Sequence, residues 1–91
     1  MRPSSNSMAD FVFSIHASEQ MKLRSIDEHV VLTILNNPEK IILEEGVSIY
    51  QSVVFMDDKF YLIRIFVNEK LTPHKVVTVY KTSKINKYNE G

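Results

Sequence analysis

One histidine and two arginines are the residues of this chain best suited to chemistry on a phosphodiester. His16 and Arg24 lie in a stretch that reads as a helix, where residues four apart share a face, so His16, Gln20 and Arg24 form one polar stripe. Histidine can act as a general acid or base, and arginine binds phosphate oxygens in a forked geometry. The stripe predicts half of an active site, and the strands that follow would supply the other half.

Arg64 is the candidate from the strands. It interrupts an apolar row in the strand predicted over residues 60–68, on the face that points away from the helices. A guanidinium there is costly to bury without an anion, which is either a carboxylate of the protein or a ligand. Thr78 and Tyr80 share this face if the last two strands are neighbours.

Together these residues favour RNA cleavage without a metal ion. That reaction needs a base for the 2′-hydroxyl, cations or donors for the phosphate, and an acid for the leaving 5′-oxygen. The candidate catalytic residues are His16, Arg24, Arg64 and Tyr80, and the candidate substrate-binding residues are Thr78, Lys81 and Lys84.

Each candidate also has a structural interpretation. A lone helix histidine such as His16 often caps or packs, and Arg64 can simply pair with a carboxylate such as Glu19 or Asp10. Thr78 and Tyr80 are good strand formers, which alone would explain them. Both interpretations stay open at the level of the sequence.

Two helices and four strands are predicted to position these side chains. Ser14 can cap a helix that stops near Arg24 or Ser25, and Asp27 can cap a second helix that reaches about Asn36. Phe11-Val12-Phe13 is an edge strand or an apolar lead-in. Strands are expected over 40–44, 48–56, 60–68 and 75–82, joined by turns short enough for an antiparallel meander. The expected fold is α+β, with two N-terminal helices packed on a four-stranded antiparallel sheet.

Successive side chains of a strand point to opposite faces of the sheet, and this alternation assigns each residue to a face. An unbroken apolar row in the third of these strands should meet the helices, while Leu62 and Phe66 point the other way and form an exposed apolar row. In the last strand, Val77 and Val79 are assigned to the core and Val76 to the opposite face. The row expected to meet the helices is Tyr61, Ile63, Ile65 and Val67.

Length and composition indicate one small domain. The chain has 91 residues, of which 44% are hydrophobic, so one modest core over residues 10–91 is expected behind a disordered leader at 1–9. Lysine and arginine number 11, as do aspartate and glutamate, which argues against a nucleic-acid binder with a basic surface throughout. Lysines do gather between Lys70 and Lys87, where they hold a phosphate backbone or merely keep a sheet edge soluble.

No metal, cofactor or membrane motif is evident. The histidines are widely separated and the two glycines form no phosphate loop, so we expect no cofactor. No apolar run approaches the ~20 residues that span a bilayer, and cysteine is absent. These features favour a cytoplasmic protein that makes no membrane contact.

The order of several short motifs resembles the domain-of-unknown-function family 4258. The matching pieces cover about residues 11–88 and are His16-Ala17, Met21, Arg24, Ile26, Val30, Ile34, Pro38, Tyr50, Leu62-Ile63-Arg64, Val77-Thr78-Val79-Tyr80, Lys84 and Tyr88. That family looks like a relative of the RelE and BrnT toxins. The resemblance implies a toxin-like ribonuclease fold, independence of metal, neutralisation by an antitoxin protein, and a site at His16, Arg24, Arg64, Thr78 and Tyr80. Gln20 departs from the pattern, since arginine is expected there.

Two hypotheses of different classes result. The first is a small metal-independent endoribonuclease of toxin type that acts on RNA, is bound by an antitoxin and is able to form a homodimer. The alternative is a non-enzymatic module of the same fold that binds a protein or an acidic ligand. The lysines from Lys70 to Lys87 and the apolar row at Leu62 and Phe66 favour the alternative.

Overall fold

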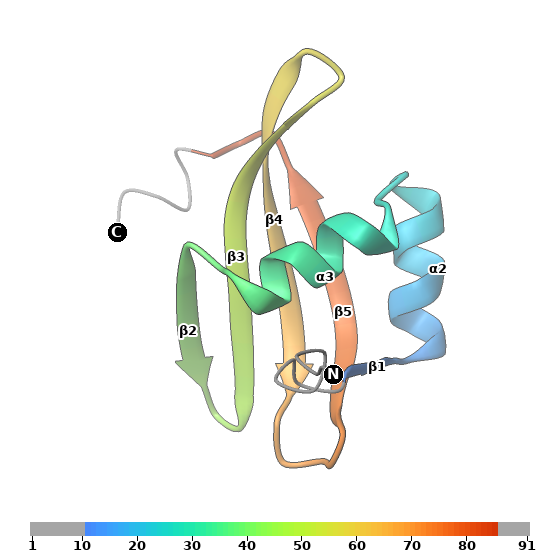
Figure 1. The fold of residues 1–91 in the computed structure, drawn as a ribbon, viewed down its shortest axis with the longest axis vertical. Helices are drawn as coiled ribbons and strands as arrows, with labels where there is room; N and C mark the ends of the chain where they lie inside the picture. The colour runs from blue at the N-terminus through green and yellow to red at the C-terminus, as the bar shows by residue number, and fades with distance from the viewer. Residues whose placement is uncertain (1–10, 86–91) are drawn as a thin grey trace, which may run out of the picture.

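The computed structural model describes residues 11–85, which form two helices and one five-stranded sheet (Figure 1). The predicted leader at 1–9 lies outside these residues. In chain order the elements are β1 (Phe11–Phe13), α2 (Ile15–Leu23), α3 (Glu28–Asn36), β2 (Lys40–Glu44), β3 (Val47–Met56), β4 (Lys59–Asn68) and β5 (His74–Thr82). Within residues 11–85, neither helix is long and apolar enough to cross a membrane.

The expected four-stranded antiparallel sheet is wrong, although the α+β class holds. The strand order is β1-β5-β4-β3-β2, and β1 pairs with β5 in parallel, so the sheet is mixed. Phe11 lies opposite His74, 63 residues later in the chain, and local turn signals cannot predict such a pairing. The other pairings are antiparallel, as expected.

Both helices begin where the sequence predicts. Ser14 caps α2, because its hydroxyl accepts a hydrogen bond from the Ala17 amide at 2.9 Å. Asp27 caps α3 in the same way, through the His29 amide at 2.9 Å. In Figure 1, α3 crosses the face of the sheet, while α2 runs beside β5.

Two tight turns set the register of β2, β3 and β4. Glu45 and Gly46 both have positive φ, as do Asp57 and Asp58, which is the backbone of two-residue type I′ hairpins. Gly46, at φ +85°, supplies this geometry without steric cost. Because the second loop contains two residues rather than the expected three, Gln51 lies opposite Arg64.

The core lies between the helices and one face of the sheet. Ile63, Ile65 and Val67 of β4 are fully buried there, which confirms three members of the predicted core row. The fourth, Tyr61, is only partly buried and lies beside the ammonium group of Lys81. The helices contribute Ala17, Met21, Val31, Ile34 and Leu35, and the connection between them contributes Ile26. The predicted exposure of Leu62 is wrong, because Leu62 is only 1% exposed although it lies on the opposite face.

An irregularity in β5 overturns the assignment of its first valines. Phe66 pairs with Thr78 but the next residue, Val67, pairs with Val76, so Val77 is an extra residue in the ladder. Val76 is fully buried in the core, whereas Val77 remains partly exposed. The bulge therefore shifts the alternation of β5 by one residue, and simple period two fails at this point.

We predict that Val76→Ala destabilises the protein by about 2 kcal/mol, because it leaves a cavity in the core. Val77→Ala is the matched control and should cost less than about 1 kcal/mol, since its side chain is partly exposed. Urea denaturation of the two variants measures the difference. Equal costs would contradict the bulge.

Candidate functional site

The structure brings Arg24, Tyr80 and Arg64 into one row on the sheet face opposite the core. The guanidinium carbon of Arg24 lies 5.5 Å from the centroid of the Tyr80 ring. Tyr80 pairs directly with Arg64 across β5 and β4, so their side chains project from the same face. A tyrosine ring thus stands between two guanidinium groups, an arrangement that we call the Arg–Tyr–Arg row.

Arg24 reaches the row because α2 lies alongside β5. Arg24 is the C-cap residue of α2, and its carbonyl accepts a hydrogen bond from Nζ of Lys81 at 2.7 Å. The same ammonium group lies 4.8 Å from the centroid of the Tyr61 ring. Lys81 therefore fastens the end of α2 to β5, and this contact accounts for its charge without a substrate.

Arg64 is held by a partner that sequence reasoning missed. Its Nε donates to Oε1 of Gln51 at 3.2 Å, and its guanidinium carbon lies 5.6 Å from the centroid of the Phe66 ring. Gln51 is only 4% exposed, so the amide is itself fixed by burial. The Asp57-Asp58 pair in the sequence could have revealed this partner. A two-residue turn at these positions places Gln51 opposite Arg64.

His16 lies on the same helix stripe as Arg24, two turns earlier. The intermediate residue, Gln20, accepts a hydrogen bond from Nε of Arg24 at 3.1 Å. His16 is exposed, and eight residues of helix separate its Cα from that of Arg24 by about 12 Å. The imidazole and the Arg–Tyr–Arg row therefore border one stretch of surface without forming a compact cluster.

The remaining candidates separate into two groups. Thr78 pairs with Phe66 and projects from the face that carries the Arg–Tyr–Arg row, one pair away from Tyr80. Lys84 is exposed beyond the end of β5, where its amide donates to the Thr82 hydroxyl at 3.0 Å. Thr78 is thus placed with the row, whereas Lys84 lies at its margin.

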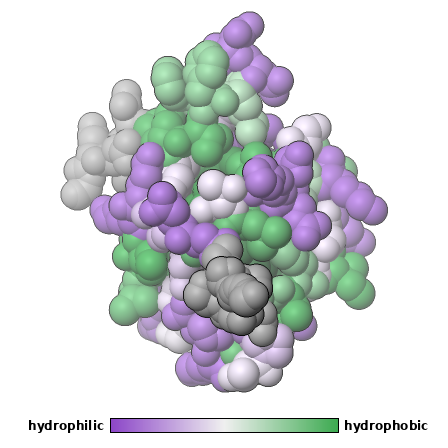
Figure 2. All heavy atoms as spheres, in the orientation of Figure 1, coloured by the Kyte–Doolittle hydropathy of each residue, from purple (hydrophilic) through white to green (hydrophobic). Residues whose placement is uncertain are grey.

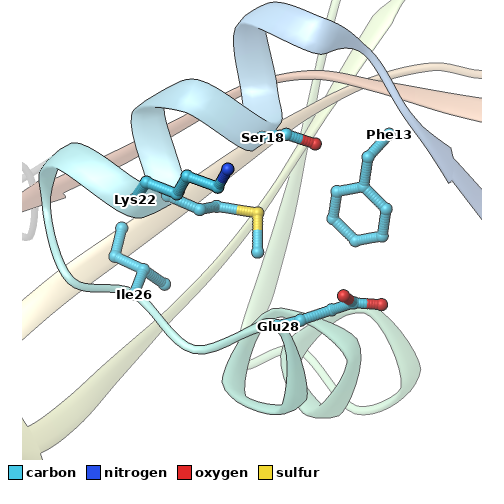
Figure 3. Close-up of a pocket in the computed structure, with 6 residues that line it drawn as sticks. Phe13, Ser18, Lys22, Ile26 and Glu28 are labelled. Carbon is cyan, nitrogen blue, oxygen red and sulfur yellow. The ribbon is translucent and has the colours of Figure 1, made fainter.

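A cavity of ≈ 330 Å³ opens between α2, α3 and β1, apart from this row (Figure 3). Phe13, Met21 and Ile26 give it an apolar lining, while Lys22 and Glu28 bring opposite charges to it. None of the candidate site residues lines it. The cavity is therefore a separate feature of the helical side of the molecule.

A polar cluster at the other end of the sheet carries the largest electrostatic effects. The Glu69 carboxylate accepts hydrogen bonds from the hydroxyls of Ser48, at 2.8 Å, and of Tyr50. The bond from Tyr50 lowers the pKa of Glu69, and the bond from Ser48 and the charge of His74 lower it further, against an opposing effect of burial. Burial, and then Glu69, raise the pKa of Tyr50 to about 12.

His74 lies beside this cluster, with its ring centroid 5.8 Å from that of Phe11. Its Nδ1 is buried without a hydrogen-bond partner among the described residues. In the same part of the chain, no group of three or more histidine, aspartate or glutamate side chains lies close enough to hold a metal ion. The cluster joins the loop after β4 to β3 through the hydrogen bonds of Glu69.

Comparisons with known proteins add no relative. No model of a protein family, no curated protein and no solved structure matches this chain. The resemblance to the domain-of-unknown-function family 4258 stays a prediction, and the candidate site rests on its own geometry.

We predict that the contribution of Glu69 to stability depends on pH. Because folding lowers its pKa from 4.5, the contribution is complete above that pH and is lost as pH falls through the lower folded value. Tyr50→Phe removes the hydrogen bond that lowers the Glu69 pKa most. It should reduce the free energy of unfolding by about 1 kcal/mol at pH 7 and by less in acid.

Urea denaturation of wild type and Tyr50→Phe between about pH 7 and pH 3 measures this difference. Ser48→Ala is the matched control, which leaves the Tyr50 bond intact and should show a smaller dependence. A cost of Tyr50→Phe that stays constant over this range would contradict the prediction.

Proposed function

We propose that this protein is a metal-independent endoribonuclease whose site is the Arg–Tyr–Arg row together with His16 and Thr78. The single observation that supports the proposal is the position of the Tyr80 ring, 5.5 Å from Arg24 and paired across the strands with Arg64. Cations on both sides of an aromatic ring match the alternation of phosphate and base along a single RNA strand.

The two arginines suit different tasks. Arg64 is positioned by Gln51 and by Phe66, which makes it the preorganised group for the phosphate charge of the transition state. Arg24 is exposed at the end of α2 and is suited to a flanking phosphate. Tyr80, between them, stacks on a base or donates its hydroxyl proton to the leaving oxygen.

His16 is the proposed general base. It is exposed on the stripe that leads to Arg24, and a substrate lying along α2 and β5 would meet both. Because about 12 Å separates the Cα atoms of His16 and Arg24, His16 is assigned to the 2′-hydroxyl next to the phosphate bound by Arg64, and Arg24 to a flanking phosphate. Thr78 contributes a hydroxyl that can bond a phosphate oxygen.

We predict that purified protein cleaves single-stranded RNA in the presence of a chelator. His16→Ala should slow cleavage by about 100-fold or more, the usual contribution of a general acid or base. Arg64→Lys keeps the charge but loses the forked geometry, and should slow cleavage by about tenfold.

The matched control is His29→Ala, which removes an exposed histidine from α3, away from the row. Its rate should equal that of wild type. Absence of cleavage by the wild-type protein, or cleavage that survives both His16→Ala and Arg64→Lys unchanged, would contradict the proposal. Circular dichroism of each variant checks that it is folded.

We predict that two substitutions of Tyr80 separate stacking from proton donation. Tyr80→Phe should bind a labelled RNA oligonucleotide like wild type but cleave it more slowly, because the ring remains and the hydroxyl is lost. Tyr80→Ala should weaken binding about tenfold, since base stacking contributes ~1–3 kcal/mol. Fluorescence anisotropy measures binding, and equal cleavage by Tyr80→Phe and wild type would exclude the hydroxyl as the acid.

The alternative is a module that binds an acidic ligand without cleaving it. It is favoured by the fact that Arg24, Tyr80 and Arg64 form a complete cationic row without His16. The apolar row at Leu62 and Phe66 no longer favours this alternative, because Leu62 is buried. Salt-dependent RNA binding with no cleavage would support this alternative.

Two parts of the proposal follow from the chemistry of the substrate. An RNA substrate and a chain without cysteine favour action in the cytoplasm. A toxin role, with an antitoxin as partner, rests on the resemblance alone. Growth arrest on expression in a bacterium, relieved by His16→Ala, would support it.

A further inference from the structure

The outer edge of β2 is an apolar strand edge that no other strand of residues 11–85 pairs with. β2 is the last strand of the sheet described for residues 11–85, and in Figure 1 it lies opposite the side that carries α2. On its core-side face, Ile41 is 47% and Leu43 is 76% exposed. Figure 2 shows hydrophobic atoms at this border of the molecule. A strand edge with unpaired amides and exposed apolar side chains is a template for another strand.

The turns around β3 determine which backbone groups of β2 face outward. The hairpin that β2 forms with β3 closes at the Glu44–Val47 pair. Bonded and non-bonded pairs alternate from there, so Glu44, Ile42 and Lys40 direct their amides and carbonyls toward β3. The groups of Ile41 and Leu43 therefore face away from the sheet.

The sequence of β2 is complementary to itself in an antiparallel sense. When Ile42 is set opposite Ile42 of a second copy, Lys40 lies opposite Glu44, and Ile41 lies opposite Leu43. Both outer pairs then join opposite charges, which favours this pairing. The Ile41–Leu43 pairs are the ones whose amides and carbonyls face outward, so they can exchange backbone hydrogen bonds across the junction.

We propose that this protein forms a symmetric homodimer in which two β2 strands pair antiparallel about Ile42. The two sheets become one continuous sheet, related by a two-fold axis perpendicular to it. Ile41 and Leu43 of each copy cover one another on the core-side face. Lys40 and Glu44 pair across the junction on the opposite face. This inference does not depend on the proposed ribonuclease activity.

The short strand limits the strength of the dimer. Five residues form β2, so the buried area falls in the class of weak and transient interfaces. We therefore expect weak dimerisation, with a dissociation constant on the order of 10 µM. Dimerisation should therefore be visible as a rise in apparent mass with concentration.

The first test replaces an outward-facing amide. Leu43→Pro removes the Leu43 amide and its hydrogen bond across the junction, while the pairing of β2 with β3 does not use that amide. Sedimentation velocity of the full chain, from roughly 1 to 500 µM, should show dimerisation weakened at least about tenfold. Circular dichroism and thermal unfolding show that the variant is folded.

The second test exchanges charges and does not depend on tolerance of proline. Lys40→Glu alone, or Glu44→Lys alone, places like charges at both outer pairs and should weaken dimerisation about tenfold. The double variant, Lys40→Glu with Glu44→Lys, should restore it. A mixture of the two single variants should also dimerise, because each charge then meets its opposite. Lys22→Glu, on the exposed part of α2, is the matched control and should behave like wild type.

The outcomes decide the proposal. Weakening by the single variants with recovery in both the double variant and the mixture supports pairing through β2 in this register. A chain that is monomeric at every concentration overturns it. A dimer that Leu43→Pro and the charge variants leave unchanged also overturns it, because its interface must then lie elsewhere.

Discussion

The hydroxyl of Ser14 joins the helical part of the molecule to the sheet. The hydroxyl accepts a hydrogen bond from the Ala17 amide and donates one to the Val77 carbonyl at 3.2 Å. The backbone amide of Ser14 donates a further hydrogen bond to the Val76 carbonyl at 2.9 Å. One residue thus ends β1, begins α2 and binds the bulged part of β5. Because β1 stops here, α2 takes the position beside the second half of β5, and only this position brings Arg24 over Tyr80.

Local chemistry made much of this fold predictable from sequence. Ser14 and Asp27 are strong caps and begin both helices where expected, and the alternation of Ile63, Ile65 and Val67 correctly predicted the core face of β4. The strand boundaries also agree within one residue. These features depend on neighbours in the chain, so a single sequence contains the information that they require.

Three failures of the sequence prediction involve partners that are distant in the chain or a change of register. The parallel pairing of β1 with β5 joins Phe11 to His74, and the bulge at Val77 reverses the faces of the first valines. A loop assigned one residue too many hid Gln51 as the partner of Arg64. For the site, the sequence correctly placed Tyr80 and Arg64 on one sheet face, but it could not show that Lys81 donates a hydrogen bond to the Arg24 carbonyl at the end of α2.

The two ends of the sheet order suit different tasks. The β5 side is covered by α2 and carries charged groups held in place by Gln51 and by α2, which suits a site that must be rigid. At the β2 side, the sheet of residues 11–85 ends in a self-complementary strand. A two-fold axis perpendicular to the sheet leaves each face of the sheet on the same side in both copies. The Arg64 side chains of the two copies would therefore project from one face of the dimer. Five strand spacings across the sheet, with an offset of about four residues along the strands, would separate them by about 28 Å. A long acidic ligand could then contact both rows at once, and linked contacts of this kind raise the apparent affinity without any new interaction within either site.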